Sequence, residues 1–570
     1  MDILKLIEDY RVTYLGEDFV WRVGQVSAIT TIVETYIEGK VKVVILNAPT
    51  GAGKSAIAMC SAWIMNQLKA TGYILTSDLA LQEQYQKDFK KFNINFGNVS
   101  GIDNYECTDN FEKNSLGTCR IRGKKPKSMP CYSECPYFSA RDHASQSSTA
   151  LLNYSYYLIM MNYVNEQMDE SPFKPRQFTF ADEAHKLLDI VQNHFSPKID
   201  KNFIDKLEKL TSFLKVYKVH DHTKELHLVK MVIKDIYVEE DNTKILALLN
   251  RLRVMLGSYL QTYVDLKKVV SENYKNSTIP KEWRSSLKTC DWVKDFHCKV
   301  EDYCKIIEET DIINLVKNRR DEEIVFNCLE ENYLMDKYFH RWSGFTVLMS
   351  ATFGSERAFL KSINVKNAKL IKMESTFDFE KSPIYFFNKR RMSKRDMEGN
   401  LPWMYDKIDQ ILSLFPNDNG IIHTVSYDLA LKIFKNISMA SRKRLLVFDG
   451  SKEKREALEN LKGSTGKVIL GPGMNEGISL DDDFARFAIL AKTPYLSLAD
   501  KFIKAKMELD PIWYKEKAIV NILQTVGRAH RSNEDFVKTY YLDACLGDLL
   551  TTSRNSFPQE FLSRIRLLDD

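Results

Sequence analysis

A glycine-rich segment at residues 48–55, Ala-Pro-Thr-Gly-Ala-Gly-Lys-Ser, has the composition of a phosphate-binding loop. Its glycines permit tight curvature after an apolar run, so main-chain N–H groups can surround phosphates at the start of a helix. Lys54 would meet the β- and γ-phosphates of ATP, and the Ser55 hydroxyl would hold Mg²⁺. Ala48 replaces the usual first glycine, which is a small change. The residues expected to contact the nucleotide in this loop are Thr50, Gly51, Ala52, Gly53, Lys54 and Ser55.

A second cluster, Asp182-Glu183-Ala184-His185, directly follows the apolar run 178–181. Carboxylates at the carboxyl end of a buried strand lie where α/β sheets bind ligands. Asp182 would coordinate Mg²⁺ through water, and Glu183 would orient and deprotonate an attacking water. Alone, the tetrad could be an acidic helix start, but after a phosphate loop it indicates nucleotide hydrolysis.

A third cluster, Gln524-Thr-Val-Gly-Arg-Ala-His-Arg, lies far downstream. Arg528 and Arg531 are three residues apart and share a helical face, so both could reach one γ-phosphate as transition-state cations. This arrangement predicts one ATP site shared by two domains, which opens and closes during hydrolysis. The predicted catalytic residues are Lys54, Asp182, Glu183, Gln524, Arg528 and Arg531.

Four cysteines lie between the first two clusters, with gaps of eleven, eleven and three residues. Their segment is polar and basic and has too few apolar residues for a core of its own, so a metal would stabilise its fold. Four thiolates suit an iron–sulfur cluster or tetrahedral zinc, and the spacing does not separate the two. The expected ligands are Cys107, Cys119, Cys131 and Cys135.

The composition is that of a folded, water-soluble protein of several domains. At 570 residues, with 44% hydrophobic and 28% charged side chains, the chain exceeds a single core. It begins without a secretory signal, and no apolar run is long enough to span a bilayer. We therefore expect no membrane partner and a cytoplasmic protein, in a bacterium or a phage-infected host, with a nuclear location as the alternative.

Positive charge is concentrated locally, although the net charge is only +5. Residues 120–127 hold five cations in eight positions, and residues 389–395 hold five in seven. Such runs are commonly solvated surface, but one attached to a metal-stapled segment favours contact with nucleic-acid phosphates.

Short β-branched runs alternate with helical stretches in two blocks, which predicts an α/β fold with two parallel sheets. Strands are expected at 41–47, 73–77, 178–181 and 345–349 in the first block, and at 383–387, 420–424, 444–448, 467–470, 487–491 and 538–542 in the second. Between the blocks, residues 200–330 show helical spacing with one apolar face, which predicts an all-helical insertion.

These patterns divide the chain into a first α/β domain with two insertions and a second α/β domain. The first domain is expected in three pieces, at 1–100, 141–199 and 331–372. The cysteine-bearing insert occupies 101–140, the helical insert 200–330, and the second domain 373–570.

The whole set of motifs resembles the iron–sulfur branch of the superfamily 2 helicases, which includes XPD and DinG. Further matches are Arg22-x-x-Gln25, Leu75-Thr-Ser77, Gly101-Ile-Asp-Asn-Tyr-Glu-Cys107, Leu152-Asn-Tyr154, Ser350-Ala-Thr352 and Glu476-Gly-Ile-Ser479. Ile102, where the family often has arginine, and the acidic residues after Ser479 depart from the family pattern.

The resemblance implies two RecA-like domains, a 4Fe-4S cluster on the four cysteines, and a helical arch. It implies a monomer that moves 5′ to 3′ on single-stranded DNA and unwinds forked duplexes, as enzymes of DNA repair and replication do. Arg22 and Gln25 would read adenine. The residues expected at the nucleic acid are Thr76, Tyr105, Arg120, Arg122, Lys124, Lys125, Thr352 and Thr424.

Two other functions fit the residues. One is a nucleic-acid sensor whose ATPase adjusts its residence at a junction without unwinding. The other is a zinc-bearing RNA remodeller, which would be colourless and stimulated more by RNA than by DNA.

Overall fold

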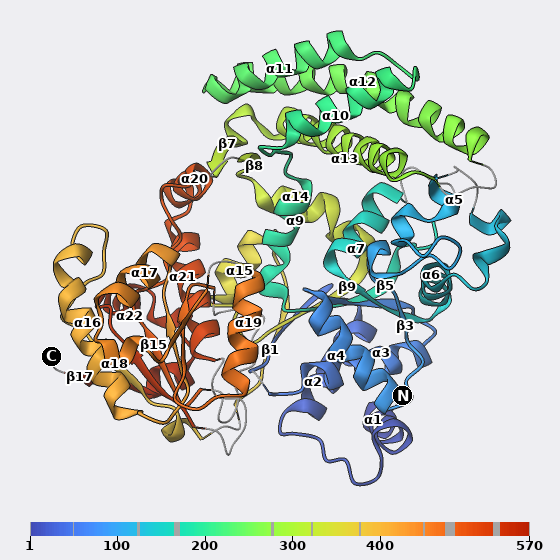
Figure 1. Cartoon of the computed structure of the whole chain (residues 1–570). Helices are drawn as coiled ribbons and strands as arrows, with labels where there is room; N and C mark the ends of the chain where they lie inside the picture. Colours follow the sequence, from blue (N-terminus) through green and yellow to red (C-terminus); the bar gives the residue numbers. More distant parts are fainter. Residues whose placement is uncertain are drawn as a thin grey trace.

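The structure is a computed structural model of the chain, shown in Figure 1. It describes residues 2–49, 51–121, 126–164, 171–274, 279–320, 323–375, 378–448, 451–473, 485–527 and 536–568.

The first sheet holds the phosphate loop and the acidic tetrad at one edge. In the described residues it has seven strands in the order β10-β1-β9-β5-β2-β4-β3, and every pair is parallel. Parallel strands end at a common edge, so the segments after β1, β5, β9 and β2 lie side by side. The strands are β1 (Val43–Asn47), β2 (Gly72–Thr76), β3 (Gly97–Asn98), β4 (Thr149–Asn153), β5 (Arg176–Asp182), β9 (Ser343–Ser350) and β10 (Lys369–Lys372).

Helices cover both faces of this sheet, so its strands are buried on both sides. One of them, α4, begins cleanly because the Asp78 side chain accepts a hydrogen bond from Leu81 N. The helices are α1 (Ile3–Tyr10), α2 (Gln25–Glu38), α3 (Lys54–Gln67), α4 (Leu79–Lys91), α5 (Thr118–Ile121), α6 (Pro136–Gln146), α7 (Tyr154–Ile159), α9 (Leu187–Phe195), α14 (Glu331–Tyr338) and α15 (Glu356–Ser362).

The second sheet also has seven parallel strands in the described residues, in the order β13-β14-β12-β15-β16-β11-β17. Its strands are β11 (Ile384–Phe387), β12 (Gly420–His423), β13 (Leu445–Val447), β14 (Val468–Gly471), β15 (Phe487–Leu490), β16 (Lys538–Tyr541) and β17 (Ile565–Leu568). Its helices are α16 (Met397–Leu414), α17 (Tyr427–Asn436), α18 (Met439–Arg442), α19 (Ser451–Lys462), α20 (Lys501–Leu509), α21 (Pro511–Val526), α22 (Cys545–Thr552) and α23 (Gln559–Ser563).

A helical layer extends away from both sheets, at the top of Figure 1. It consists of α10 (Phe203–Val216), α11 (Thr223–Val238), α12 (Asn242–Asn273) and α13 (Lys281–Thr310). Beyond the predicted helices, the segment carries β7 (Leu315–Arg320) and β8 (Glu323–Cys328), which pair antiparallel with each other. The other side of β8 pairs antiparallel with β6 (Lys198–Ile199). This small sheet joins the helical layer to the domain of the first sheet.

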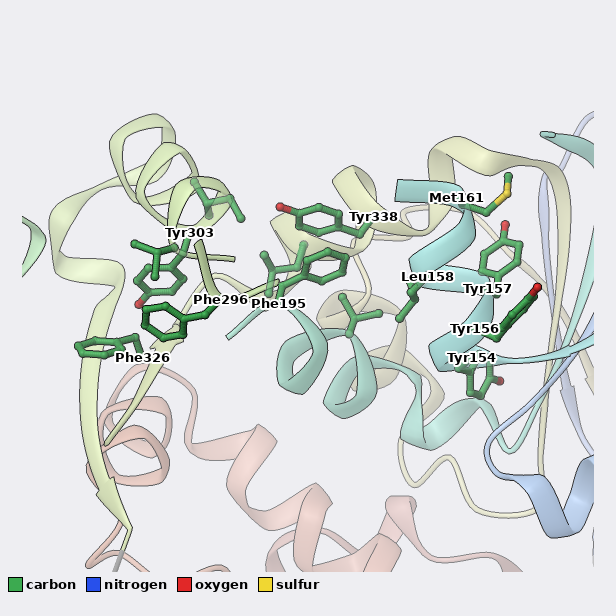
Figure 2. Close-up of a cluster of buried hydrophobic side chains, with 14 of the residues drawn as sticks. Tyr154, Tyr156, Tyr157, Leu158, Met161, Phe195, Phe296, Tyr303, Phe326 and Tyr338 are labelled. Atoms are coloured by element: carbon green, nitrogen blue, oxygen red, sulfur yellow. The ribbon is translucent and has the colours of Figure 1, made fainter. Parts of the chain in front are cut away.

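Buried aromatic side chains connect the two inserts with the first sheet. Figure 2 shows them running from α7 through α9 and α14 to α13 and β8. The rings of Phe195 and Tyr338 stack with centroids 3.4 Å apart, and the Tyr303 hydroxyl donates to Asn327 O at 2.8 Å. The cysteine-bearing insert contributes Tyr137 and Phe138 to the same core. Neither insert is therefore an independent unit.

The predicted fold class is confirmed: there are two parallel-sheet domains, and each predicted strand is found within a few residues of its expected position. The prediction missed β3, β4, β6, β7, β8, β10 and β17. The domain boundaries proposed above stay predictions.

Candidate nucleotide site between the two sheets

A cavity of about 670 Å³ lies at the carboxyl edge of the first sheet and reaches α21 of the second domain. The sequence clusters meet in it: Lys54 and Ser55 from the phosphate loop, Asp182 and Glu183 after β5, and Gln524 from α21. Segments more than 300 residues apart thus line one space, and it can hold a nucleotide.

The phosphate loop has the backbone that its glycines predict. Gly51 and Gly53 have φ of 79° and 76°, in the left-handed region that favours glycine. A Cβ at Gly53 would also collide with the Gln25 amide. Gly53 directly precedes α3, so the first N–H groups of that helix point toward the cavity.

Arg22 and Gln25, the expected adenine readers, contact the phosphate loop itself. Arg22 donates to Gly51 O. The buried Gln25 side chain donates to Ala52 O at 2.9 Å and accepts from Arg22 N at 2.8 Å. Because both ends of the Gln25 amide are occupied by main-chain groups, this residue holds the loop in place. Arg22 remains exposed at the cavity wall.

Three protein groups hold the Asp182 carboxylate and its backbone. The Tyr85 hydroxyl of α4 donates to Asp182 Oδ2 at 2.9 Å, and Glu183 N donates to Oδ1 at 2.8 Å. The Tyr154 hydroxyl of α7 donates to Asp182 O at 2.7 Å. Burial raises the pKa of Asp182 to about 6, and Lys54 acts in the opposite direction. A cation at this carboxylate would therefore favour its ionised form.

Helix α4 also approaches the phosphate loop, since the Ser55 side chain lies near the Asp88 carboxylate and lowers its pKa, against the larger effect of burial. Tyr85 and Asp88 are three residues apart, on one face of the helix. Both expected magnesium ligands, Ser55 and Asp182, thus have neighbours on the same helix.

His185 links the tetrad to the second domain. Its Nδ1 lies 2.8 Å from Ser350 Oγ, and its Nε2 meets the Gln524 amide, which also reaches Thr352 Oγ1 at 3.5 Å. Burial lowers the pKa of His185 to about 4, so the ring is neutral at pH 7 and can both donate and accept. The tetrad, the Ser350–Thr352 motif and α21 therefore form one hydrogen-bonded chain across the domain boundary.

Two residues expected at the nucleic acid have hydroxyls that are used within the protein. Thr76 and Thr424 are completely buried, and each hydroxyl donates to the carbonyl two residues on, at 3.2 and 2.9 Å. Each threonine closes the turn from a strand into a helix, so neither hydroxyl is presented to a ligand. Thr352 lies in the cleft between the domains, where it lines the nucleotide cavity.

Tyr105 is half-buried and packs locally. Its ring meets Tyr137 edge-on at 5.6 Å, and its hydroxyl accepts a hydrogen bond from Ser100 N at 3.1 Å. This packing therefore does not support the prediction that Tyr105 stacks on a base. Arg120 is exposed at the surface of the insert. The remaining expected site residues lie outside the described part of the chain: Thr50, Arg122, Lys124, Lys125, Arg528 and Arg531.

The four insert cysteines gather in one place. Cys107, Cys119 and Cys135 are buried and Cys131 is half-exposed, and none is in a disulfide. Burial raises the pKa of Cys119, and the other three thiols add to that rise, which places all four within electrostatic range. Asn114 Nδ2 also donates to Cys135 Sγ at 3.2 Å. In the described residues, however, no three His, Cys, Asp or Glu side chains are close enough to ligate one metal ion.

Comparison with known proteins agrees with this arrangement. The Helicase C-terminal domain family matches residues 408–561, and the family of the type III restriction enzyme res subunit matches residues 18–207. Among solved structures, Xpd4 of S. tokodaii shares 17% identity with a TM-score of 0.60, over 96% of this chain and 100% of that one. A structure titled XPD helicase shares 15% identity with a TM-score of 0.65, over 97% and 100%.

The chain has the fold of these two XPD structures. No curated protein sequence matches the chain. Within the residues that the structure describes, none of the helices is both long and apolar enough to cross a membrane.

Several residues that shape this cavity were not identified from the sequence. Phe19 lines the cavity beside Arg22, and Tyr85 and Asp88 lie beside the two expected magnesium ligands. In the sequence, Phe19 could have been identified by its position three residues before Arg22. Tyr85 and Asp88 lie on an amphipathic helix. From its spacing alone, Tyr85 cannot be distinguished from a tyrosine that only packs in the core.

The buried histidines predict a fall in stability below pH 6.5. Burial lowers the pKa of His185, His194 and His423 to about 4. Between pH 6.5 and 4 the unfolded chain therefore binds more protons than the folded one, and stability decreases as pH falls. We expect each histidine to contribute a loss of about 2 kcal/mol by pH 5. Chemical denaturation at pH 7 and pH 5 measures this, and His423→Gln should reduce the difference. A free energy of unfolding that is unchanged between the two pH values would contradict it.

Proposed function

We propose that the chain is an ATP-dependent DNA helicase that moves 5′ to 3′ on single-stranded DNA and unwinds forked duplexes. The observation that supports this most is the shared cavity, in which the phosphate loop, the acidic tetrad and Gln524 of the second domain meet. A nucleotide bound there would contact both domains, so its hydrolysis would change their separation.

In this proposal the phosphate loop and Lys54 hold the ATP phosphates, and Ser55 and Asp182 are the protein groups that bind Mg²⁺. Mg²⁺ neutralises charge that develops on the transferred phosphoryl group. Glu183 orients a water and accepts its proton. Arg528 and Arg531, which lie outside the described residues, would stabilise the transition state.

The His185–Gln524 contact supports a route from hydrolysis to movement. Gln524 joins the second domain to His185 and to Thr352. Loss of the γ-phosphate would alter the tetrad, and this hydrogen-bonded chain would transmit the change to α21. Opening and closing of the cleft would then move the chain along the strand as a monomer, because the site is complete within one copy.

For the cysteine-bearing insert we propose a 4Fe-4S cluster on Cys107, Cys119, Cys131 and Cys135. The proximity of the four thiols to one another supports one shared site. The choice of the cluster over zinc rests on the resemblance to the iron–sulfur helicases. The cluster would stabilise an insert that contains short helices and turns.

The first test is ATP hydrolysis by the purified full chain, with single-stranded DNA, single-stranded RNA or no nucleic acid. We expect strong stimulation by DNA and loss of hydrolysis, with retained DNA binding, in Lys54→Ala. Stronger stimulation by RNA would favour an RNA remodeller. Unchanged biological function in Lys54→Ala would favour an ATP-independent binding protein.

Tyr85→Phe is expected to weaken magnesium use. It removes one hydrogen bond to Asp182 Oδ2 without changing the ring, which is completely buried. A hydrogen bond to a charged group contributes about 1.5–3 kcal/mol, so we expect the half-saturating Mg²⁺ concentration to rise roughly tenfold. Titration of ATP hydrolysis with Mg²⁺, and Mn²⁺ binding followed by electron paramagnetic resonance, measure this.

Tyr10→Phe is the matched control for this prediction. Tyr10 is equally buried in the same core as Tyr85, and its hydroxyl has no hydrogen-bond partner in the described residues. If the two variants have the same metal dependence, Tyr85 does not position Asp182.

A further inference from the structure

The two sheets have the same strand order when each is numbered by its own chain order. Both read 7-1-6-5-2-4-3 from one edge to the other. The first strand of the second sheet, β11, therefore corresponds to β1, and β12 corresponds to β2. The buried threonines support this correspondence, since Thr76 after β2 and Thr424 after β12 make the same turn. The loop after β11 occupies the position that the phosphate loop has in the first sheet.

This loop, residues 388–396, is Asn-Lys-Arg-Arg-Met-Ser-Lys-Arg-Asp. It lacks the glycines that let a phosphate loop wrap a nucleotide with its main chain. It carries five cations instead, and all five are exposed. The anion-binding groups here would be side chains that point outward rather than N–H groups that surround a pocket.

The backbone of the loop is held firmly. Met392 is completely buried in the core of the second domain, and its N–H donates to Asp543 Oδ1 at 2.8 Å. The same buried carboxylate accepts from Thr493 N and Cys545 N, at 2.8 and 2.9 Å. Ala544 N donates to Arg390 O at 2.9 Å. The cations are thus presented on an ordered turn and not on a free coil, which lowers the entropy cost of binding.

Two cations of the loop form ion pairs at the surface. Arg391 pairs with Asp548, and Arg395 pairs with Asp396. Both pairs are at the surface, and the Arg395 side chain is 90% exposed. Exposed ion pairs contribute little to stability, so a phosphate can replace the carboxylate at small cost.

We propose that this loop, which we call the β11 loop, binds the backbone phosphates of the single strand on the second motor domain. The inference rests on the proposed function, because it names one contact between the proposed helicase and its single strand. The β11 loop lies on the same sheet edge as the turn at Thr424, because the strands from β12 to β11 are all parallel. Main-chain hydrogen bonds join neighbouring loops at this edge, from Ala491 N to His423 O and from Ala544 N to Arg390 O. Three strand spacings separate β12 from β11, or about 14 Å. A strand that crosses this edge would meet the cations in succession.

The test is the salt dependence of single-stranded DNA binding by the full chain carrying Lys394→Glu and Arg395→Glu. Each lost phosphate contact on a single strand lowers the slope of log K against log salt by about 0.7, so we expect a decrease of about 1.4. The affinity at low salt should fall at least roughly tenfold. Basal ATP hydrolysis should be unchanged, because none of these residues lines the nucleotide cavity.

The matched control carries Lys435→Glu and Lys443→Glu. These exposed cations lie at the end of α17 and just before β13, at the opposite edge of the same sheet. The control has the same change in net charge, so the slope difference between the two variants reports position alone. Lys394→Gln with Arg395→Gln provides a milder pair if the charge reversal prevents folding, and it should show the same decrease in slope.

Equal slopes in the two double variants would overturn the proposal while leaving the helicase proposal intact. A wild-type chain that binds no single-stranded DNA would overturn both. If inorganic tripolyphosphate, but not DNA, loses affinity in the β11-loop variant, the loop binds free polyphosphate and the proposal is wrong.

Discussion

Glu183→Gln is expected to lower the rate of ATP hydrolysis by about 10²- to 10⁴-fold, because the glutamine amide cannot accept a proton from the attacking water. The substitution preserves size, and the backbone of Glu183 still donates to Asp182 Oδ1. ATP affinity should change little. Steady-state hydrolysis and equilibrium binding of a nucleotide analogue separate these two effects.

Glu83→Gln is the control for this variant, since Glu83 is an exposed carboxylate on α4. It should hydrolyse ATP at the wild-type rate. If Glu183→Gln retains more than about a tenth of the wild-type rate, Glu183 is not the general base and the chemistry proposed for the cavity is wrong.

Cys131→Ser is expected to abolish stable iron binding and the broad visible absorbance of an iron–sulfur cluster, in protein purified without oxygen. The four thiols are close together, and removal of one leaves an iron without its protein ligand. DNA unwinding should be lost with the iron, because the insert packs against the first sheet through Tyr137 and Phe138. ATP hydrolysis in the absence of DNA should remain.

Cys298→Ser is the matched thiol control, since Cys298 is half-buried on α13 and lies outside the insert. It should retain full iron and sulfide content. Stoichiometric zinc in a colourless wild-type protein would contradict the cluster, and so would unchanged iron in Cys131→Ser.

Much of the fold could be predicted because buried parallel strands are continuous apolar runs. Residues 43–47 and 468–471 are examples, and both are sheet strands in the structure. β4 and β8 were missed although each is a buried, largely apolar run. The other missed strands are short or partly exposed, as at β3 and β17, or have no apolar pattern, as at β7 with Lys317, Asn318 and Arg319. Their stability comes from tertiary pairing, which a local pattern does not encode.

The main groups of the nucleotide site could be predicted from the sequence, but the residues that hold them in position could not. Lys54, Asp182 and Gln524 belong to short motifs with fixed spacing, and the structure brings them together. Tyr85 and Tyr154 reach Asp182 from separate helices, so only the three-dimensional fold reveals them. Thr76 and Thr424 were expected at the nucleic acid from their motif positions, and in the structure the side chain of each closes a turn.

The most direct test of the account is unwinding of labelled forked DNA that carries either a 5′ or a 3′ single-stranded tail. It uses wild-type protein and Lys54→Ala, with ATP or a non-hydrolysable analogue. The account predicts that the wild type displaces the strand of the 5′-tailed substrate only when ATP is hydrolysed, and that Lys54→Ala binds the fork without unwinding it. ATP hydrolysis stimulated by DNA without displacement of either substrate would contradict the proposed helicase.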